Sequence, residues 1–457
     1  MDRSTPPSFT PPALTAEFFP RLVRHLPEAE VRRAAAASRR IGPPRERKVP
    51  RHFVLWLSVA AAIFSRHPFT QVARLLIPGF AADRLPSSSV LAQGRARLGW
   101  LPLRELARRI VRPLATLLGT PGAFHRGLRL LAVDGATLSL PDTPANGRAC
   151  GYARNQHRGS HFPRLRIAAL CELGTHAVLR WITKPWRVSE VPMARALIPF
   201  LEAGQLLLHD CNFFGFPFWK AAISRGAHLL GRVQTGPLLR PRTRLADGSY
   251  TARMYPTTQD RLRDTGGIDV RVVEYVHRDP DRVRCGARTR LVTTLLDPAT
   301  DPAQTLIALY HRRWDQELAF DEIKTHLADR AVELRSRTPV GVLQDLSALL
   351  VGHWVLRAAM VEAGELAGVD PLALSFTGTL RIVQIHLREA PADDAGTEFR
   401  DWWKGLLGEI AGTELPPKRN RLYPRVIKAG RNKFPSKKKH HRERAAKPFA
   451  DWVEVAN

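Results

Sequence analysis

The sequence predicts an α/β protein, with one mixed sheet flanked by helices, a helical N-terminal domain and a basic C-terminal tail. Changes in the spacing of apolar residues along the chain predict this fold class. Helical periodicity recurs from Val49 to Leu118. After Gly127 the apolar residues follow period two or form short runs, which is typical of strands, and helical periodicity returns after residue 300. With 457 residues, 44% of them hydrophobic, the chain has room for roughly two to four units and at least one large core.

The N-terminal part is predicted to be helical. Residues 1–30 are rich in proline and are predicted to be loosely ordered, and residues 31–122 are predicted to form a helical DNA-binding domain. The most apolar run, Phe53 to Phe64, is only 12 residues long, so it predicts a buried helix and no membrane span. The piece "SSSVLAQGRARLG" offers a serine cap before a basic helix that could lie in a DNA groove. A basic face exposed to solvent explains this piece equally well.

The charge of the chain indicates a polyanionic partner. Seventy Lys and Arg against 42 Asp and Glu give a net charge of +28, spread from end to end. Arginine far outnumbers lysine, so a genome that favours arginine codons would explain part of the excess. The N-terminus has no signal-peptide pattern. The cysteines stand too far apart for a zinc site and are predicted to be reduced core residues of a cytosolic protein: Cys150, Cys171, Cys211 and Cys285.

Residues 123–234 are predicted to form the first part of the sheet domain. Strands and helices follow in the order β-β-β-α-β-α-β: "LRLLAVDGATLSL", "RLRIAALCEL", "HAVLRWIT", "VPMARALIPFLEAG", "QLLLHDCNFFG", "FPFWKAAISRG" and "HLLGRVQ". This order is that of a ribonuclease-H-like sheet. Residues 235–300 are predicted to be a β insertion and residues 301–365 the helical second part of the same domain. Residues 366–457 are predicted to hold a helical region and a polybasic tail, which is disordered without its partner.

Two aspartates follow apolar runs of the predicted sheet. "LLAVDG" is predicted to end in Asp134 and "LLLHDC" in Asp210. Each aspartate alone could simply form a turn. Neighbouring strands, however, would bring both carboxylates to one point, and Glu317 from a helix on that sheet would add a third. Three such oxygen ligands suit Mg²⁺ or Mn²⁺, and a pair of these ions can activate a water or hydroxyl in phosphodiester chemistry.

The segment "LYHRRWDQELAFDEIKTHL", Leu309 to Leu327, is predicted to be one helix. At about 100° per residue, four polar residues share one narrow face: Tyr310, Arg313, Glu317 and Lys324. The two cations and the tyrosine could contact phosphates. The alternative is an i,i+4 salt bridge between Arg313 and Glu317 on a solvent face. Asp321 projects near the same face, so the helix alone does not decide which acid is the third ligand.

The residues carry a resemblance to a known family. The spacing of the four polar residues matches the tyrosine-arginine-glutamate-lysine signature of DDE transposases in the insertion-sequence-four family. Asp134 and Asp210 look like the family's first and second acids, with a β insertion between the second and the third, Glu317. "VLWLSVAAAIFSRHPFTQVARLL" is similar to the family's helical N-terminal segment. The resemblance covers about residues 50–360.

The resemblance implies a DNA transposase that cleaves the ends of an insertion sequence and joins them to target DNA by a cut-and-paste route. Asp134, Asp210 and Glu317 would hold two Mg²⁺ or Mn²⁺ ions, and Tyr310, Arg313 and Lys324 would bind DNA phosphates. The implied partners are double-stranded DNA, at terminal inverted repeats and at the target, and a second protomer. No membrane partner is expected, and the implied location is the bacterial cytoplasm, at the nucleoid. Two alternatives remain: a ribonuclease-H-like nuclease that cuts without joining, and a transposase-derived DNA-binding protein that no longer catalyses.

Two departures from the family pattern stand out. In many relatives an arginine follows the second acid, whereas here Cys211 follows Asp210, which weakens one expected phosphate contact. Some relatives use a tryptophan in the β insertion to trap a flipped base while the DNA end forms a hairpin, and residues 235–300 contain none. Tryptophans are more often core residues. The candidates elsewhere are Trp181, Trp186 and Trp314.

Overall fold

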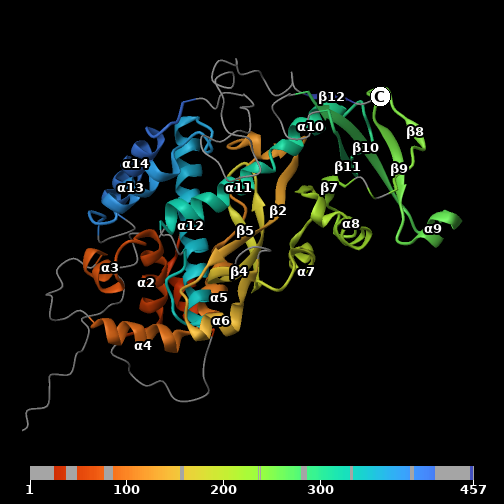
Figure 1. Cartoon of the computed structure of the whole chain (residues 1–457). Coiled ribbons are helices and arrows are strands. Elements are labelled where there is room, and N and C mark those ends of the chain that lie inside the picture. The colour runs from red at the N-terminus through yellow and green to blue at the C-terminus, as the bar shows by residue number, and fades with distance from the viewer. Residues whose placement is uncertain are drawn as a thin grey trace, which may run out of the picture.

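The computed structural model shows one large sheet with a long helix, α12 (Pro339–Ala367), between the sheet and the N-terminal helices (Figure 1). The described residues are 25–37, 49–76, 86–154, 159–234, 236, 238–278, 286–329, 333–391, 396–416 and 453–455. The proline-rich residues 1–24 and nearly all of the predicted basic tail lie outside these ranges.

The sheet begins with the strand order that the sequence predicts. β2 (Leu128–Ser139), β4 (Gly159–Glu172) and β5 (Val178–Pro185) pair antiparallel, with β4 in the middle. On the other side of β2, β6 (Gln205–His209) and β7 (His228–Val233) add two parallel strands. The spatial order β5-β4-β2-β6-β7 is that of a ribonuclease-H-like sheet, so the predicted fold class is confirmed.

The strands of the β insertion extend this same sheet. β11 (Arg288–Thr293) pairs antiparallel with β7, and β10 (Ile268–His277), β9 (Tyr250–Met254) and β8 (Thr243–Arg244) follow in order. The C-terminal strand β12 (Val453–Val455) returns to pair with β10. Backbone hydrogen bonds therefore fix the insertion relative to β6 and β7. The shorter elements are β1 (Phe124–His125), α6 (Pro144–Cys150), β3 (Tyr152–Arg154) and α9 (Thr258–Arg263).

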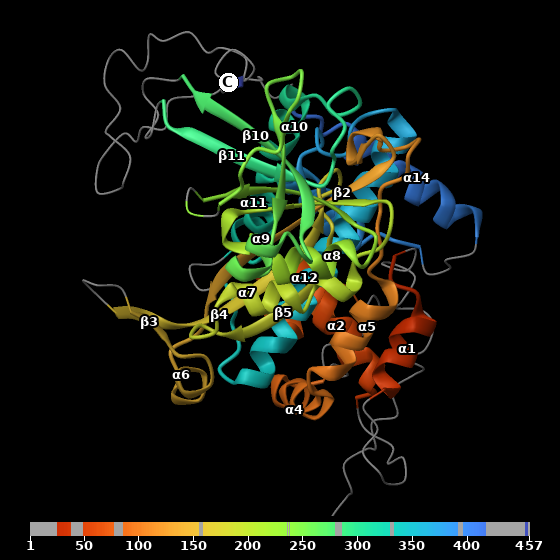
Figure 2. The same cartoon turned by 90° about the vertical axis from the view of Figure 1, so that its right-hand side faces the viewer.

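Two hydrophobic cores lie on the two faces of the sheet. The larger core joins the sheet to α12 and to other helices, which include α1 (Glu28–Ala36), α2 (Arg51–Ile63), α3 (Phe69–Leu76), α4 (Ser88–Leu98), α5 (Leu101–Ile110), α13 (Phe376–His386) and α14 (Thr397–Ala411). The smaller core lies under α10 (Ala303–His311), which both views place beside β10 and β11 (Figures 1 and 2). The N-terminal helices thus share one core with the sheet.

Local sequence explains where several helices begin and end. The apolar run Phe53–Phe64 forms the buried helix α2, as predicted. Ser87 caps α4, because its Oγ accepts a hydrogen bond from the Val90 amide at 3.4 Å. The single helix predicted for "VPMARALIPFLEAG" is wrong. α7 (Glu190–Arg195) stops early and a 3-10 turn, Ile198–Phe200, follows, because Pro199 has no N–H to continue an α-helix; α8 (Phe216–Ile223) comes after β6.

In the described part of the chain, α12 is the one helix long and apolar enough to cross a membrane, and its apolar stretch is almost wholly buried inside the protein. Its burial against α2 and α14 marks it as a core helix. Cys150 and Cys171 are buried as predicted, Cys211 is half-buried, and Cys285 lies outside the described residues.

The insertion anchors the start of α10. Arg271 of β10 is fully buried, and its Nη1 donates to the carbonyl oxygen of Asp301 at 2.7 Å. Asp247 pairs with Arg271 and accepts a hydrogen bond from the Ala303 amide at 2.8 Å. Because Ala303 is the first residue of α10, this buried pair fixes the helix that ends in Tyr310 and His311.

Candidate active site

Three neighbouring strands carry a charged residue at the same level of the sheet. The register aligns Val133 of β2 with His209 of β6, and His209 with Gly231 of β7. The next residues along these strands form what we call the charged row: Asp134, Asp210 and Arg232. Side chains of one row on parallel strands point to the same face. That face is the one under α10, where residues two places earlier, such as Leu208, are buried.

The prediction that the first strand ends in Asp134 is wrong. β2 continues to Ser139, because β4 pairs with it as far as the contact of Ser139 with Arg164. β6, on the other side, ends at His209. Asp134 therefore lies inside a strand but beside the open end of its parallel neighbour, where Asp210 begins a 3-10 turn.

The predicted helix of Leu309–Leu327 is broken into three pieces. α10 ends at His311, and α11 (Trp314–Asp321) is followed by a π-helical turn, Glu322–Leu327. Both residues of the first break bind groups far away in the chain, because Arg312 donates to the carbonyl of Gly122, just before β1, and Arg313 donates to Asp134 of β2. The shared face expected for one straight helix is therefore lost. The four signature residues are distributed over all three pieces and the break.

Arg313 lies between two of the three predicted acids. Its Nη1 donates to Asp134 Oδ2 at 2.7 Å, and its Nη2 donates to Glu317 Oε1 at 3.3 Å. Arg313 is only 8% exposed. The i,i+4 salt bridge that the sequence left open thus exists, with Glu317 exposed, and the buried guanidinium of Arg313 extends it to Asp134, which joins the helix to the sheet. Asp210 has a different cation, since Arg232 Nη2 lies 3.7 Å from its Oδ1.

The two aspartates differ in pKa because their surroundings differ. Burial raises the pKa of Asp134 to about 6; the charges of Glu317 and Asp210 add to this, while Arg313 and the Gly135 amide oppose it. Burial would also raise the pKa of Asp210. The hydrogen bonds from Cys211 and the charges of the two arginines outweigh that effect, so the pKa of Asp210 is lowered. Burial and the neighbouring carboxylates therefore disfavour the ionised form of Asp134, whereas the ionised form of Asp210 is stabilised.

Tyr310 borders the same site. It is buried at the end of α10, and burial raises the pKa of its phenol to about 12. The charges of Arg313, Asp210 and Arg232 also act on that pKa, which places the phenol among these groups. Tyr310 therefore joins the acids, as the sequence predicts.

Lys324 does not join them. Its Nζ lies 3.8 Å from Glu333 Oε1, and Glu333 accepts a hydrogen bond from the Ser139 amide at 2.8 Å. Ser139 ends β2, which at about 3.4 Å per residue is roughly 17 Å beyond Asp134. Lys324, in the π-helical turn, therefore lies beside the far end of β2. It could contact a phosphate only at a distance from the acids.

The rival acid Asp321 makes local contacts. It accepts a hydrogen bond from Thr325 Oγ1 at 2.6 Å and lies 3.5 Å from His326 Nε2. Among the described residues, no three His, Cys, Asp or Glu side chains are gathered closely enough to hold a metal ion as they stand. At the predicted acids the reason is visible, since the guanidinium of Arg313 lies between Asp134 and Glu317.

The tryptophan candidates lie at different distances from this site. Trp314 begins α11 beside Arg313 and is 41% exposed. Trp181 packs against the larger core, and Trp186 lies under the guanidinium of Arg166 at 4.4 Å. Trp314 is therefore the candidate next to the acids.

A buried network holds the π-helical turn beneath the site. Glu322 Oε1 accepts from His176 Nδ1 at 2.8 Å, and its Oε2 accepts from His353 Nε2 and Arg357 Nε, both at 2.9 Å. The charge of Arg357 and the hydrogen bonds from the histidines outweigh the effect of burial, so the pKa of Glu322 is well below its ordinary value. The network ties the end of α11 to α12 and to the turn between β4 and β5.

Sequence reasoning missed both Arg232 and the Glu322 network. Arg232 had a usable signal, because three strands repeat one pattern: "LLAVD", "LLLHD" and "HLLGR" each place a charge after an apolar run. The Glu322 network had none, because His176, His353 and Arg357 are far apart in the sequence.

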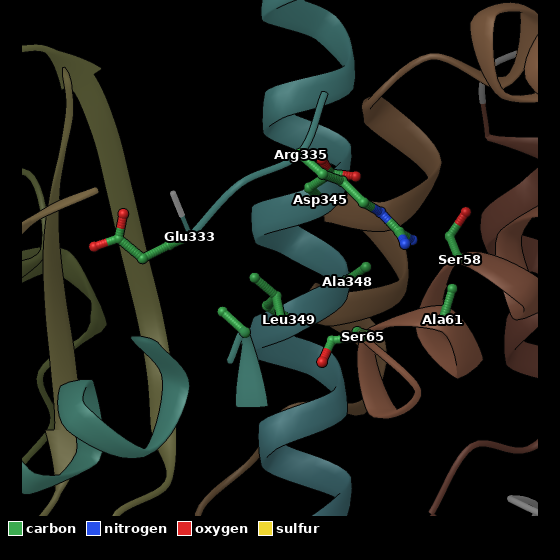
Figure 3. Close-up of a pocket in the computed structure, with 10 residues that line it drawn as sticks. Ser58, Ala61, Ser65, Glu333, Arg335, Asp345, Ala348 and Leu349 are labelled. Carbon is green, nitrogen blue, oxygen red and sulfur yellow. The ribbon is translucent and has the colours of Figure 1, made fainter. Parts of the chain in front are cut away.

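The small cavity in Figure 3 lies apart from the acids, between α2 and α12. Its polar lining includes Ser58, Arg335 and Asp345. Its volume is about 30 Å³, enough for about one water molecule. It cannot hold a nucleotide.

Comparison with known families decides the class of protein. A model described as "Transposase DDE domain" matches residues 125–351, and one described as "Insertion element 4 transposase N-terminal" matches residues 17–108. The chain belongs to the insertion element 4 family of DDE transposases. The resemblance drawn from the signature residues is thereby confirmed, and the chain is a transposase and an enzyme by family.

Two known proteins resemble this transposase over most of its length. The transposase InsG for insertion sequence element IS4, from Escherichia coli strain K12, is 27% identical over 402 residues, 86% of this chain and 88% of InsG. A cryo-EM structure of a piggyBac transposase synaptic complex with hairpin DNA aligns with 88% of this chain and 85% of that chain. Its TM-score is 0.42 and its sequence identity is 12%.

Proposed function

We propose that this transposase moves an insertion sequence by a cut-and-paste route: it cleaves the DNA strands at the ends of the element and joins them to a target. The observation that carries the proposal is the convergence of Asp134, Asp210 and Glu317 from two parallel strands and one helix. Each acid comes from a different element, and the charges of Glu317 and Asp210 both act on Asp134, beside Arg313 and Arg232.

The three predicted acids have the ligand type that divalent metal ions bind. Asp134, Asp210 and Glu317 would hold Mg²⁺ or Mn²⁺, since carboxylate oxygens are the ligands that these ions prefer. The raised pKa of Asp134 supports this assignment, because a cation would relieve the cost of its buried charge. When bound, the ions supply an activated water or hydroxyl and stabilise the leaving oxygen. For the metal ions to bind, Arg313 would have to break its hydrogen bond to Asp134 or to Glu317.

The remaining residues would bind and orient the DNA. Arg313, once free of one carboxylate, can turn its planar guanidinium to a phosphate, and the Tyr310 hydroxyl can donate to another phosphate oxygen. Lys324 would hold the DNA farther along β2 as a point charge. The N-terminal helices and the basic tail would bind the terminal repeats, in a complex of two protomers at the bacterial nucleoid. The excess of positive charge over the whole chain supports a DNA partner.

The test is a cleavage and joining assay. A duplex with the terminal repeat, incubated with the protein, Mg²⁺ and a target plasmid, should yield cleaved ends and covalently joined products. Cleaved ends without joined products would favour the nuclease alternative. Binding without cleavage would favour the DNA-binding protein that no longer catalyses. Short inverted repeats beside the gene, bounded by direct repeats, would identify the duplex to use.

A further inference from the structure

Arg232 occupies the third position of the charged row. It lies on β7 one residue beyond Gly231, as Asp210 lies one residue beyond His209 on β6. Its side chain therefore points to the face that carries the two aspartates. Its Nη2 lies 3.7 Å from Asp210 Oδ1, which makes it a close neighbour of that acid.

The guanidinium of Arg232 is open to a further partner. Its side chain is 43% exposed, against 10% for Arg313. It donates a hydrogen bond to Cys211 Sγ at 3.3 Å, and sulfur is a weak acceptor. The distance to Asp210 exceeds that of a normal hydrogen bond. A guanidinium has five N–H donors, so a strong anionic acceptor could bind here without displacing any strong contact.

We propose that Arg232 binds a phosphate of the DNA strand that is cut and holds this strand against Asp210. The inference rests on the proposed function, since it requires DNA at the acids. Arg313 cannot take this place as it stands, because both of its terminal nitrogens donate to carboxylates. Arg232 is thus the cation at the acids that is already exposed and only weakly bound.

Cys211 strengthens the assignment. Its sulfur accepts a hydrogen bond from the guanidinium of Arg232 at 3.3 Å, so the two side chains meet at one point. A long cation at position 211 would therefore reach the same point from the neighbouring strand. The two positions can supply one phosphate contact between them, and in this chain Arg232 supplies it.

The test measures binding without cleavage. The test compares the DNA affinity of three proteins in EDTA: wild type, Arg232→Ala and a control, Arg288→Ala. Each protein binds a set of terminal-repeat duplexes, and in each duplex one phosphate near the cut is replaced by a neutral methylphosphonate. Arg288 is a matched control because it lies on the adjacent strand β11, on the opposite face, and pairs with Glu274. Wild type and control should lose roughly ten- to a hundredfold in affinity at the position of the phosphate that Arg232 binds. Arg232→Ala should bind the unmodified duplex that much more weakly and be insensitive at that position.

Two results would overturn the inference. Arg232→Ala could stay as sensitive as wild type at every position, or it could keep its DNA affinity while needing much more Mg²⁺ for cleavage, which would make Arg232 only a positioning residue for Asp210. Adding Cys211→Arg to Arg232→Ala should restore affinity and sensitivity, and no recovery would contradict the shared contact. A wild-type protein that binds but never cleaves in Mg²⁺ would refute the proposed function and leave this binding test valid.

Discussion

Arg313 donates to Asp134 at 2.7 Å, from the break between α10 and α11 to the middle of β2. The bond joins the helical part of the site to the sheet, and a cation of the protein itself neutralises the most buried of the three acids. Any ion that binds Asp134 and Glu317 together has to compete with this guanidinium. The same side chain can thus bridge Asp134 and Glu317 before DNA binds and hold a phosphate afterwards.

The role of Arg313 can be separated from that of a metal ligand. Arg313→Ala should slow cleavage roughly ten- to a hundredfold, because the variant cannot make a charge-assisted hydrogen bond to the phosphate. It should not raise the Mg²⁺ concentration for half-maximal nicking, because removing a competing cation leaves the acids more attractive to Mg²⁺. Arg313→Lys should also be impaired, since it lacks the planar fork. Lys324→Ala should weaken assembly on the DNA end and leave the Mg²⁺ titration unchanged. A large rise in Mg²⁺ requirement for Arg313→Ala would mean that it merely orients Glu317.

Each of the three acids should be essential for chemistry and dispensable for binding. Asp134→Ala, Asp210→Ala and Glu317→Ala should each abolish strand cleavage, because two ions cannot be held with one ligand missing. Gel-shift affinity for the terminal repeat should stay nearly intact. Asp321→Ala is the control, since its carboxylate is bound within the π-helical turn, and it should keep at least part of the activity. Robust cleavage by one of the first three variants would remove that residue from the site.

The buried charge of Asp134 should make the metal-free protein less stable as the pH rises. Its pKa is about 6 in the folded protein and near 4 in the unfolded chain, so the folded state binds more protons between these values. The free energy of unfolding should therefore fall between about pH 4 and pH 6, by up to about 3 kcal/mol, and change little above. Asp134→Asn should lack this fall. The measurement is urea unfolding of both proteins in EDTA from pH 4.5 to 7.5; parallel curves would contradict the prediction.

Breaking the Glu322 network should strongly destabilise the protein. Glu322→Ala leaves Arg357 buried without its carboxylate, which typically costs about 3 to 5 kcal/mol. The π-helical turn should loosen with it, and cleavage should fall together with stability. Chemical denaturation of the variant at pH 7 measures the first effect. A destabilisation below about 1 kcal/mol would mean that water enters the network and replaces the carboxylate.

The basic tail should contribute to DNA affinity through charge. Removing the whole C-terminal segment would also remove β12 from the edge of β10, so substitutions are the cleaner test. Changing Lys437, Lys438 and Lys439 to Gln should weaken duplex binding and flatten its salt dependence, by about 0.9 for each phosphate that these lysines neutralise. Binding is measured from 50 to 200 mM salt. An unchanged slope would count against a DNA role for these lysines.

The sequence by itself determined the family and the order of the fold. Apolar runs and one spacing pattern predict Asp134, Asp210 and Glu317 as the acids and carry the resemblance to the family, and the strand order follows from periodicity. The sequence also determined the buried helix α2, because an apolar run of 12 residues is too short to span a membrane and therefore packs inside the protein. The strands and α2 depend on residues close together in the chain, where the spacing of apolar residues indicates which side chains face the core.

Only the tertiary structure decided how the site is arranged. The helix break at Arg313 needs groups from the sheet domain, and no nearby Gly or Pro marks it. Arg232 joins the aspartates because β7 pairs with β6 in one register out of several possible ones. Lys324 leaves the shared face because Glu322, two residues earlier, is held by His176, His353 and Arg357. Each of these contacts joins residues from separate parts of the chain, so their free energy outweighs local helix preference only once the whole sheet and α12 are assembled.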